Sequence, residues 1–205
     1  MTQLTTAITA RVLLLIDAVD RASPHRVSDL DLIRLAYFAD AFSDLWGLHP
    51  IERYRLKVQE PRSQLVRSAL NRLVLSGVIE PSAVRLTSHP TPHLSARYRV
   101  VPAIAQPILR AIAATAVGRR EMDMVYEVVY ASAGLLDGSL AEAVWQDATY
   151  GDSRIGPSDL LDLGPSTGGT SATARLFSRG VASQAVKEAE LTHMYMAHLE
   201  RSINR

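Results

Sequence analysis

Histidines and a short Gly-Ser-Thr stretch are the residues of this chain whose types could support metal binding or phosphate binding. His89 and His93 are four residues apart, a metal-ligand spacing only within a helix, and two prolines lie between them. His193 and His198 are five apart and would not share one helical face. The run Gly-Gly-Thr-Ser at 168–171 lacks the lysine of a phosphate loop, and no predicted strand precedes it. The spacing therefore favours neither a zinc site nor a nucleotide site.

Nucleophilic catalysis is not indicated either. Ser, His and Asp all occur, but the chain contains no Gly-x-Ser-x-Gly elbow and no His-Glu-x-x-His pair. We assign no catalytic, cofactor-binding or metal-binding residue. The sequence thus predicts a protein that is not an enzyme, needs no cofactor and works through its partners.

Basic residues around one helix and one loop supply the best candidates for contact with DNA or with a partner protein. Arginine binds phosphates, and arginine and asparagine can also read base edges. The candidate contact residues are Arg62, Arg67, Asn71, Arg72, Arg85, His89, His93, Arg97 and Arg99. A solvated helix face and an exposed stiff loop remain the alternatives for the two groups, and protein docking is an alternative to DNA reading.

The composition limits the range of partners. The 205 residues include 47% hydrophobic and 21% charged ones, which is typical of a globular protein with a core. Twenty-two Lys and Arg against 21 Asp and Glu leave a net charge of +1, so any contact with nucleic acid must be local. Cysteine is absent, and the apolar run at 12–16 is too short to span a bilayer. We expect a cytoplasmic protein that does not enter a membrane.

The stretch at residues 61–80 predicts the element that would position the basic residues. Pro61 suits a first helical position and Gly77 a left-handed residue after the last turn. One side of this helix is an apolar stripe of Leu65, Ala69, Leu70, Leu73 and Val74. Two short strand-like segments follow, the first with apolar residues at 78–79 and 83–86 and the second at 97–101, joined by residues 87–95. Helix, strand, loop and strand in this order predict a winged helix.

Two further helices and a short strand are predicted before this stretch. Residues 6–21 have apolar side chains at helical spacing, and Ser23-Pro24 ends that helix. Ser28 can cap a second helix that ends near Gly47 and forms the centre of the amino-terminal core. Residues 54–58 alternate in polarity as a short strand does.

The pattern after Pro102 predicts helices only. We expect helices at 104–117, ended by Gly118, and at 119–136, then a short helix from the cap Ser139 to Trp145. Residues 147–174 are rich in Gly, Ser, Thr and Pro and predict a mobile connection, with Ser158 as a cap for one turn. A terminal helix is expected at 181–203.

The terminal helix has an apolar side that is a candidate for binding a partner. Its residues are Leu191, Met194, Tyr195, Leu199 and Ile203. Packing of this side into the core is the alternative. The fold class predicted overall is mostly α with a small β-wing (α+β): a winged-helix domain over 1–102 and a helical extension over 103–205.

Three stretches carry a resemblance to a known family. They are DLIRLAYFADAFSDLWGL at 31–48, LVRSALNRLVLSGVIE at 65–80 and VVYASAGLLDGSLAEAVWQDATYGD at 128–152. The chain resembles the middle component of ABC three-component, Lamassu-like defence systems. The resemblance implies an accessory subunit that bridges an SMC-type ABC ATPase and an effector in an anti-phage or anti-plasmid complex, with double-stranded DNA as a candidate further partner.

Two other functions are kept as alternatives. The YFAD helix is similar to that of the SocA-like Panacea antitoxin domain, which implies binding and neutralising a toxin. The chain has Gln59-Glu60-Pro61 where that domain would have a tyrosine-glycine-proline turn, which favours the first family. The second alternative is a winged-helix DNA-binding regulator. Neither family supplies active-site residues.

Overall fold

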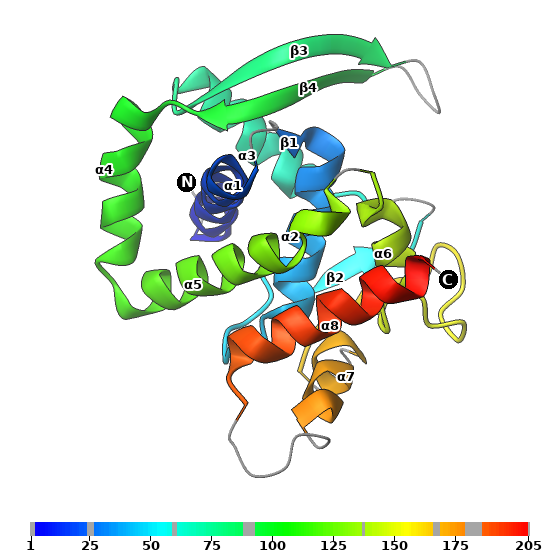
Figure 1. Cartoon of the computed structure of the whole chain (residues 1–205). Coiled ribbons are helices and arrows are strands. Elements are labelled where there is room, and N and C mark those ends of the chain that lie inside the picture. The colour runs from blue at the N-terminus through cyan, green and yellow to red at the C-terminus, as the bar shows by residue number, and fades with distance from the viewer. Residues whose placement is uncertain are drawn as a thin grey trace.

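The computed structural model describes residues 3–23, 27–58, 61–87, 93–136, 138–165, 169–178 and 186–204. Helices dominate, and two small antiparallel sheets accompany them (Figure 1). The predicted class, mostly α with a small β-component, is confirmed.

Helix α1 (Gln3–Ala22) runs through the middle of the first half of the chain. Its side chains are buried on every side from Arg11 to Val19, as expected of a helix that is apolar around most of its circumference. It packs against α2 (Asp29–Phe42), α3 (Gln64–Leu75) and α5 (Ala116–Ala131). Helix α1 is therefore the element around which the others are assembled.

Helix α2 begins as the sequence predicts. The Ser28 side chain accepts a hydrogen bond from the Asp31 N–H at 3.1 Å, and Asp29 and Asp31 lie at the positive end of the helix. Eleven of its residues are buried, among them Tyr37 and Phe38, so its predicted place in the core is confirmed.

Helix α3 begins later than predicted and ends as predicted. Its N-cap is Ser63, whose Oγ accepts from the Val66 N–H at 3.0 Å, so Pro61 is not its first residue. A serine oxygen can satisfy one of the free N–H groups of the first turn, and it therefore sets the boundary. At the other end Gly77 has φ +71°, and Val78 N–H donates to Leu73 O at 3.0 Å in a Schellman motif.

The larger sheet follows α3. Strands β3 (Ile79–Thr87) and β4 (His93–Val100) form a hairpin, and β1 (Val27–Ser28) pairs with the other edge of β4, so the order is β1-β4-β3. The register of the hairpin shifts between Ser82 and Arg85, where Ala83 has φ +49°. The hairpin extends beyond the helices at its far end (Figure 1).

The helices after the sheet differ from the predicted boundaries. Helix α4 (Pro102–Ala113) ends before a cap at Thr115, whose Oγ1 accepts from the Gly118 N–H at 3.0 Å. The break therefore comes before Gly118, which lies inside α5. A Cβ on Gly118 would lie 2.1 Å from the Ile112 carbonyl oxygen, so this close turn between α4 and α5 requires glycine. A 3₁₀ turn (Ala133–Leu135) follows α5.

The stretch at 147–174, predicted to be a mobile connection, has regular secondary structure and buried residues where it is described. After α6 (Leu140–Gln146), Asp147, Tyr150 and Leu161 are fully buried. Strand β5 (Leu160–Asp162) pairs with β2 (Tyr54–Leu56), and α7 begins within the same stretch (Gly169–Ser178). Ser158 caps no helix and has φ +72°. Long-range pairing and burial order a segment whose composition is typical of a loop.

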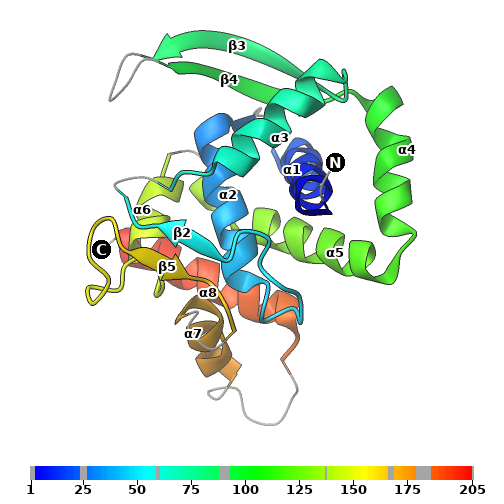
Figure 2. The ribbon, with the colours of Figure 1, turned by 180° about the vertical axis from the view of Figure 1, so that it is seen from behind.

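The terminal helix α8 (Glu188–Ile203) completes a core shared by both halves of the chain. The predicted boundary at 102 does not separate two cores: α1 packs on α5, and the β2–β5 sheet joins the halves (Figure 2). The apolar stripes of α1, α2, α5 and α8 are covered by one another, which two separate domains could not achieve. No described helix has the length and apolar character that a membrane span requires.

Candidate functional site

The densest cluster of polar side chains surrounds Asp147, in the stretch that was predicted to be a loop. Its carboxylate is fully buried and accepts hydrogen bonds from the hydroxyl groups of Tyr37, Tyr195 and Thr170. The distances are 2.7 Å from Tyr195 and 2.8 Å from Thr170. The backbone N–H groups of Thr149 and Tyr150 donate to it at 2.9 and 3.1 Å. Neutral donors thus replace the water that a buried carboxylate loses.

The two tyrosines of this cluster are held in their neutral form. Burial raises the pKa of Tyr37 and of Tyr195, and the charge of Asp147 raises both further. Because both phenols donate to the carboxylate, neither offers a base or a nucleophile to a ligand. The cluster ties α2, α7 and α8 to the turn after α6, which is a structural role.

A second buried network joins α1, α2 and β2. The carboxylate of Asp40 is fully buried and binds Arg11 and Arg55, the latter at 2.8 Å. Burial acts against the charge of Arg11, but Asp40 and Glu121 outweigh it and raise the arginine pKa. The Ile51 N–H also donates to Asp40 at 2.7 Å. These charges are compensated inside the chain and position the loop that leads to β2.

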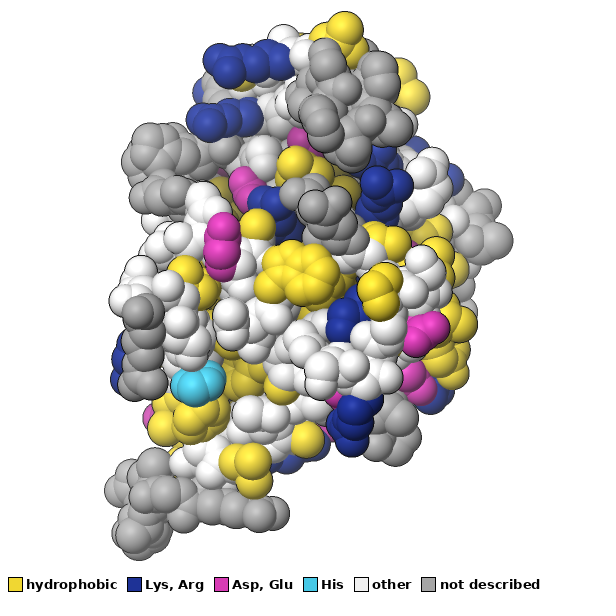
Figure 3. Space-filling model, turned by 90° about the vertical axis from the view of Figure 1, so that its right-hand side faces the viewer, with side chains coloured by type: hydrophobic (Ala, Val, Ile, Leu, Met, Phe, Trp, Pro, Cys, Tyr) yellow, Lys and Arg dark blue, Asp and Glu magenta, His cyan; other side chains and the backbone are white. Residues whose placement is uncertain are grey.

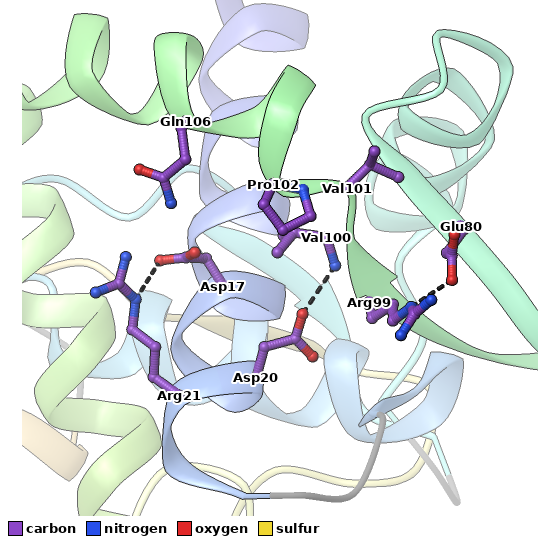
Figure 4. A pocket seen from close by; sticks show the side chains of 9 residues that line it. All are labelled: Asp17, Asp20, Arg21, Glu80, Arg99, Val100, Val101, Pro102 and Gln106. Atoms are coloured by element: carbon purple, nitrogen blue, oxygen red, sulfur yellow. Dashed lines mark hydrogen bonds and ion pairs between the residues drawn. The ribbon is translucent and has the colours of Figure 1, made fainter.

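A pocket of about 590 Å³ lies where α1, the hairpin base and α4 meet (Figure 4). Asp17 is bound to Arg21 at 2.8 Å, and Asp20 accepts from the Val100 N–H at 2.8 Å. Glu80 pairs with Arg99 across the hairpin. Figure 4 shows these groups turned toward one another in pairs. The charged groups named here are thus bound by one another or by the backbone.

The arginines predicted on α3 do not all face solvent. Arg62, Asn71 and Arg72 are exposed, as a contact surface requires. Arg67 is partly buried and lies near Tyr98. Burial and the charge of Asp29 raise the pKa of Tyr98, and the charge of Arg67 lowers it. The charge of Arg67 therefore acts on the side of α3 that faces Tyr98 of β4 and is less available to a partner than that of Arg62 or Arg72.

The arginines predicted on the hairpin form a different surface from those on α3. The register pairs Arg85 with Ser95, Ser82 with Arg97 and Glu80 with Arg99, so the three arginines share one face of the sheet. The other face, with Ile79 and Ala96 buried, packs on the helices. Arg85, Arg97 and Arg99 thus point away from α3, and the nine predicted contact residues are not one patch.

The two histidines predicted as contact residues, His89 and His93, are not shown to form a binding site. His89 lies outside the described residues, and His93 begins β4 with its backbone opposite Thr87. Among the described residues, no group of three or more His, Asp and Glu side chains could hold a metal ion. Of the carboxy-terminal histidines, His193 binds Glu127 at 2.8 Å on the surface.

The predicted partner side of α8 is mostly core. Leu191, Tyr195 and Leu199 expose 6%, 1% and 1% of their surface, and Ile203 packs partly buried against the same core. Met194 is partly buried as well. The apolar side of α8 therefore packs into the core, which was the alternative prediction, because α5, α6 and α7 all cover this helix.

The exposed apolar surfaces lie elsewhere and were not predicted. The sheet surface consists of Tyr54 and Leu56 on β2 and Leu160 on β5, with exposed fractions of 56%, 55% and 63%. Leu56 and Leu160 are directly paired, and Trp145 on α6 is exposed nearby, stacked edge-on against Tyr150. Figure 3 shows hydrophobic side chains in the middle of the face at this end.

The second exposed apolar surface is on α4, at the other side of the molecule (Figures 1 and 2). Ile104 and Ile108 are 44% and 38% exposed, and Leu75 at the end of α3 is 87% exposed. The alternation of β2 and the helical spacing of α4 were visible in the sequence. Neither pattern says which apolar residues the rest of the chain leaves uncovered.

Comparison with known proteins identifies no relative. No family model matches the chain, no curated protein matches it, and no solved structure matches its fold.

Proposed function

We propose that this chain is a non-catalytic, cytoplasmic adaptor subunit of a prokaryotic defence complex, which bridges an SMC-type ABC ATPase and an effector. The observation that carries the proposal is the pair of exposed apolar surfaces at opposite sides of the molecule, on the β2–β5 sheet and on α4. Exposed apolar clusters with aromatic residues are typical of protein interfaces. Two such surfaces suit a subunit that holds two partners at once.

The order of elements supports a winged-helix assignment for the first half. Helices α1, α2 and α3 precede the β3–β4 hairpin, and the short β1 between α1 and α2 completes a sheet of order β1-β4-β3. This arrangement is the one that a winged helix needs, with α3 as the exposed helix and the hairpin as the wing. Winged helices serve both in DNA binding and in protein assembly, so the fold alone does not choose a function.

The interior supports a structural use of the chain's ionisable groups. Asp147 and Asp40, both fully buried, are bound by donors from several elements. The charged groups of the pocket beside α4 are bound within the chain as well. Side chains committed in this way hold a rigid body together, and a rigid body is what an adaptor contributes to a complex.

The test is reconstitution with the ATPase and the effector encoded beside this chain. We expect the chain to bind each partner alone and to be required for a ternary complex, measured by light scattering after gel filtration. The chain alone should neither hydrolyse nucleotide nor cut nucleic acid. Neutralisation of a single toxin in the absence of any ATPase would support the Panacea-like antitoxin function instead.

Direct DNA binding is a second candidate function, and the exposed side of α3 favours it. Asn71 and Arg72 are exposed on α3 and Arg62 is exposed just before its cap, and neither arginine forms an ion pair with a described residue. If α3 contacts DNA, the double change Arg62→Ala and Asn71→Ala should weaken duplex binding and flatten its salt dependence. Fluorescence anisotropy with a labelled duplex at two salt concentrations measures both effects.

A further inference from the structure

Part of the outward side of α4 is apolar along almost the whole length of the helix. Ala105 and Leu109 are its buried side chains and face α1 and α5. Most of the exposed apolar side chains form two rows with a spacing of four residues, as packing ridges on helices do, and Pro102, Gln106 and Arg110 form a third row beside them. One row is Ala103, Pro107 and Ala111, and the other is Ile104 and Ile108.

The apolar surface continues from α4 onto the end of α3. Leu75 is 87% exposed in the last turn of α3, two residues before Gly77. The Ile104 Cδ1 lies 3.7 Å from where a Cβ of Gly77 would be, so the two helix ends meet there. We call the following residues the α4 surface: Leu75, Ala103, Ile104, Pro107, Ile108 and Ala111.

Two exposed arginines border the α4 surface, and both lack an acidic partner within the chain as described. Arg72 precedes Leu75 by three residues on the same side of α3, and Arg110 follows Pro107 by three on α4. Neither forms an ion pair with a described residue, whereas the acids Glu80 and Asp17 are bound by Arg99 and Arg21. The border of the surface therefore carries positive charge without compensation.

We propose that the α4 surface binds an amphipathic helix of a partner protein, and that Asp and Glu side chains flank the apolar face of that helix. Two rows at a spacing of four, with alanines between larger side chains, accept the ridges of another helix at close range. Acidic side chains beside the apolar face of that helix would complement the two arginines. A second copy of this chain would bring the same arginines to the interface, so the charge disfavours self-association through this side.

The inference deepens the proposed adaptor function and rests on it, since it assigns one of the two apolar surfaces to one partner. Helix α4 stands at the edge of the molecule, away from α6, α7 and α8 (Figures 1 and 2). A helix docked there would leave the β2–β5 sheet free for the other partner.

The experiment measures binding of the full chain to the purified SMC-type ATPase and, separately, to the purified effector encoded beside it. The variants are Ile104→Glu, and Arg72→Glu combined with Arg110→Glu. Leu176→Glu is the matched control, because Leu176 is 53% exposed on α7, outside both surfaces. Calorimetry at low and high salt gives the affinities, and thermal unfolding checks that each variant keeps the wild-type fold.

We expect both α4 variants to lose at least tenfold in affinity for one of the two proteins and to keep wild-type affinity for the other. The arginine variant should also lose the salt dependence of that binding, because its flanking charges are reversed. The control variant should bind both proteins as the wild type does.

The outcomes separate the inference from the proposed function. If the wild type binds both proteins and the α4 variants bind them equally well, the inference is overturned and the adaptor function stands. If the wild type binds neither protein, the adaptor function is overturned and the inference with it. A wild-type dimer that Ile104→Glu converts to a monomer would show that a second copy occupies the surface. Equal weakening by Leu176→Glu would also overturn the inference.

Discussion

Helices α8 and α4 both have an apolar side, but that of α8 is buried by other helices and that of α4 is partly exposed. On α8 that side is covered by α5, α6 and α7, so Leu199 exposes 1% of its surface. On α4 the apolar residues exceed what α1 and α5 cover, so Ile104 and Ile108 stay exposed. An apolar side predicts that a helix is covered, but its neighbours decide whether the cover comes from the same chain.

Polar contacts fix α8 in place and have no counterpart on the exposed side of α4. The Tyr195 hydroxyl donates to Asp147 at 2.7 Å and accepts from the Ala148 N–H at 2.9 Å. The Trp46 indole N–H donates to the Thr192 hydroxyl at 3.2 Å. Buried hydrogen bonds of this kind give one defined orientation to a helix that apolar packing alone would hold less specifically.

The largest difference between the two helices is expected from truncating an apolar side chain in each. Leu199→Ala should lower the free energy of unfolding by about 2–5 kcal/mol, because it opens a cavity in the core. Ile104→Ala should lower it by about 1 kcal/mol or less, because that side chain is already partly in water. Urea unfolding followed by circular dichroism measures both. Equal losses would contradict the contrast between a covered and an uncovered helix.

The hydroxyl of Tyr195 should account for a smaller part of the stability of α8. Tyr195→Phe removes a donor from the buried Asp147 carboxylate, which should cost about 1–3 kcal/mol. Tyr130→Phe is the control, since Tyr130 is 39% exposed on α5, and it should change stability by less than about 0.5 kcal/mol. Chemical unfolding of both variants and of the wild type measures these changes in the free energy of unfolding. An unchanged stability of Tyr195→Phe would show that the contact with Asp147 adds nothing.

High pH should break the α8 contacts in one step. Since burial and Asp147 raise the pKa of Tyr195 and Tyr37, the folded state favours their neutral forms. Their contribution to stability is complete below the pKa of an unfolded tyrosine, about 10, and is lost as pH rises toward the folded values. We expect their phenolate absorbance to appear only together with unfolding. Ionisation before any loss of helical signal would refute this.

The smallest effect is expected at Met194, the partly exposed member of the side of α8 that was predicted to bind a partner. Met194→Ala should change stability by about 1 kcal/mol or less. It should leave the affinity for both proposed partner proteins unchanged, unlike Ile104→Glu on α4. Calorimetric titration measures these affinities. A clear loss of binding would instead show that α8 contacts a partner protein.

Local interactions explain the predictions that the structure confirms. Ser28 and Gly77 mark helix ends because a cap or a left-handed residue acts on backbone groups within four or five positions. The burial of α2 follows from its apolar density, and the short strand at Tyr54–Leu56 follows from alternation. Even here two local signals competed: Ser63, not Pro61, starts α3, since its hydroxyl binds a free N–H.

The sequence by itself determined the class of the fold, the presence of most helices and the two ends that Ser28 and Gly77 mark. Only the tertiary structure decided that Leu161 enters a sheet with Arg55, that Asp147 lies at a buried centre, and that α8 is core while α4 is surface. Periodicity and capping depend on neighbours within one or two turns of the chain. Strand pairing and burial depend on residues about a hundred positions away, and a local sequence pattern does not predict which of these residues will be in contact.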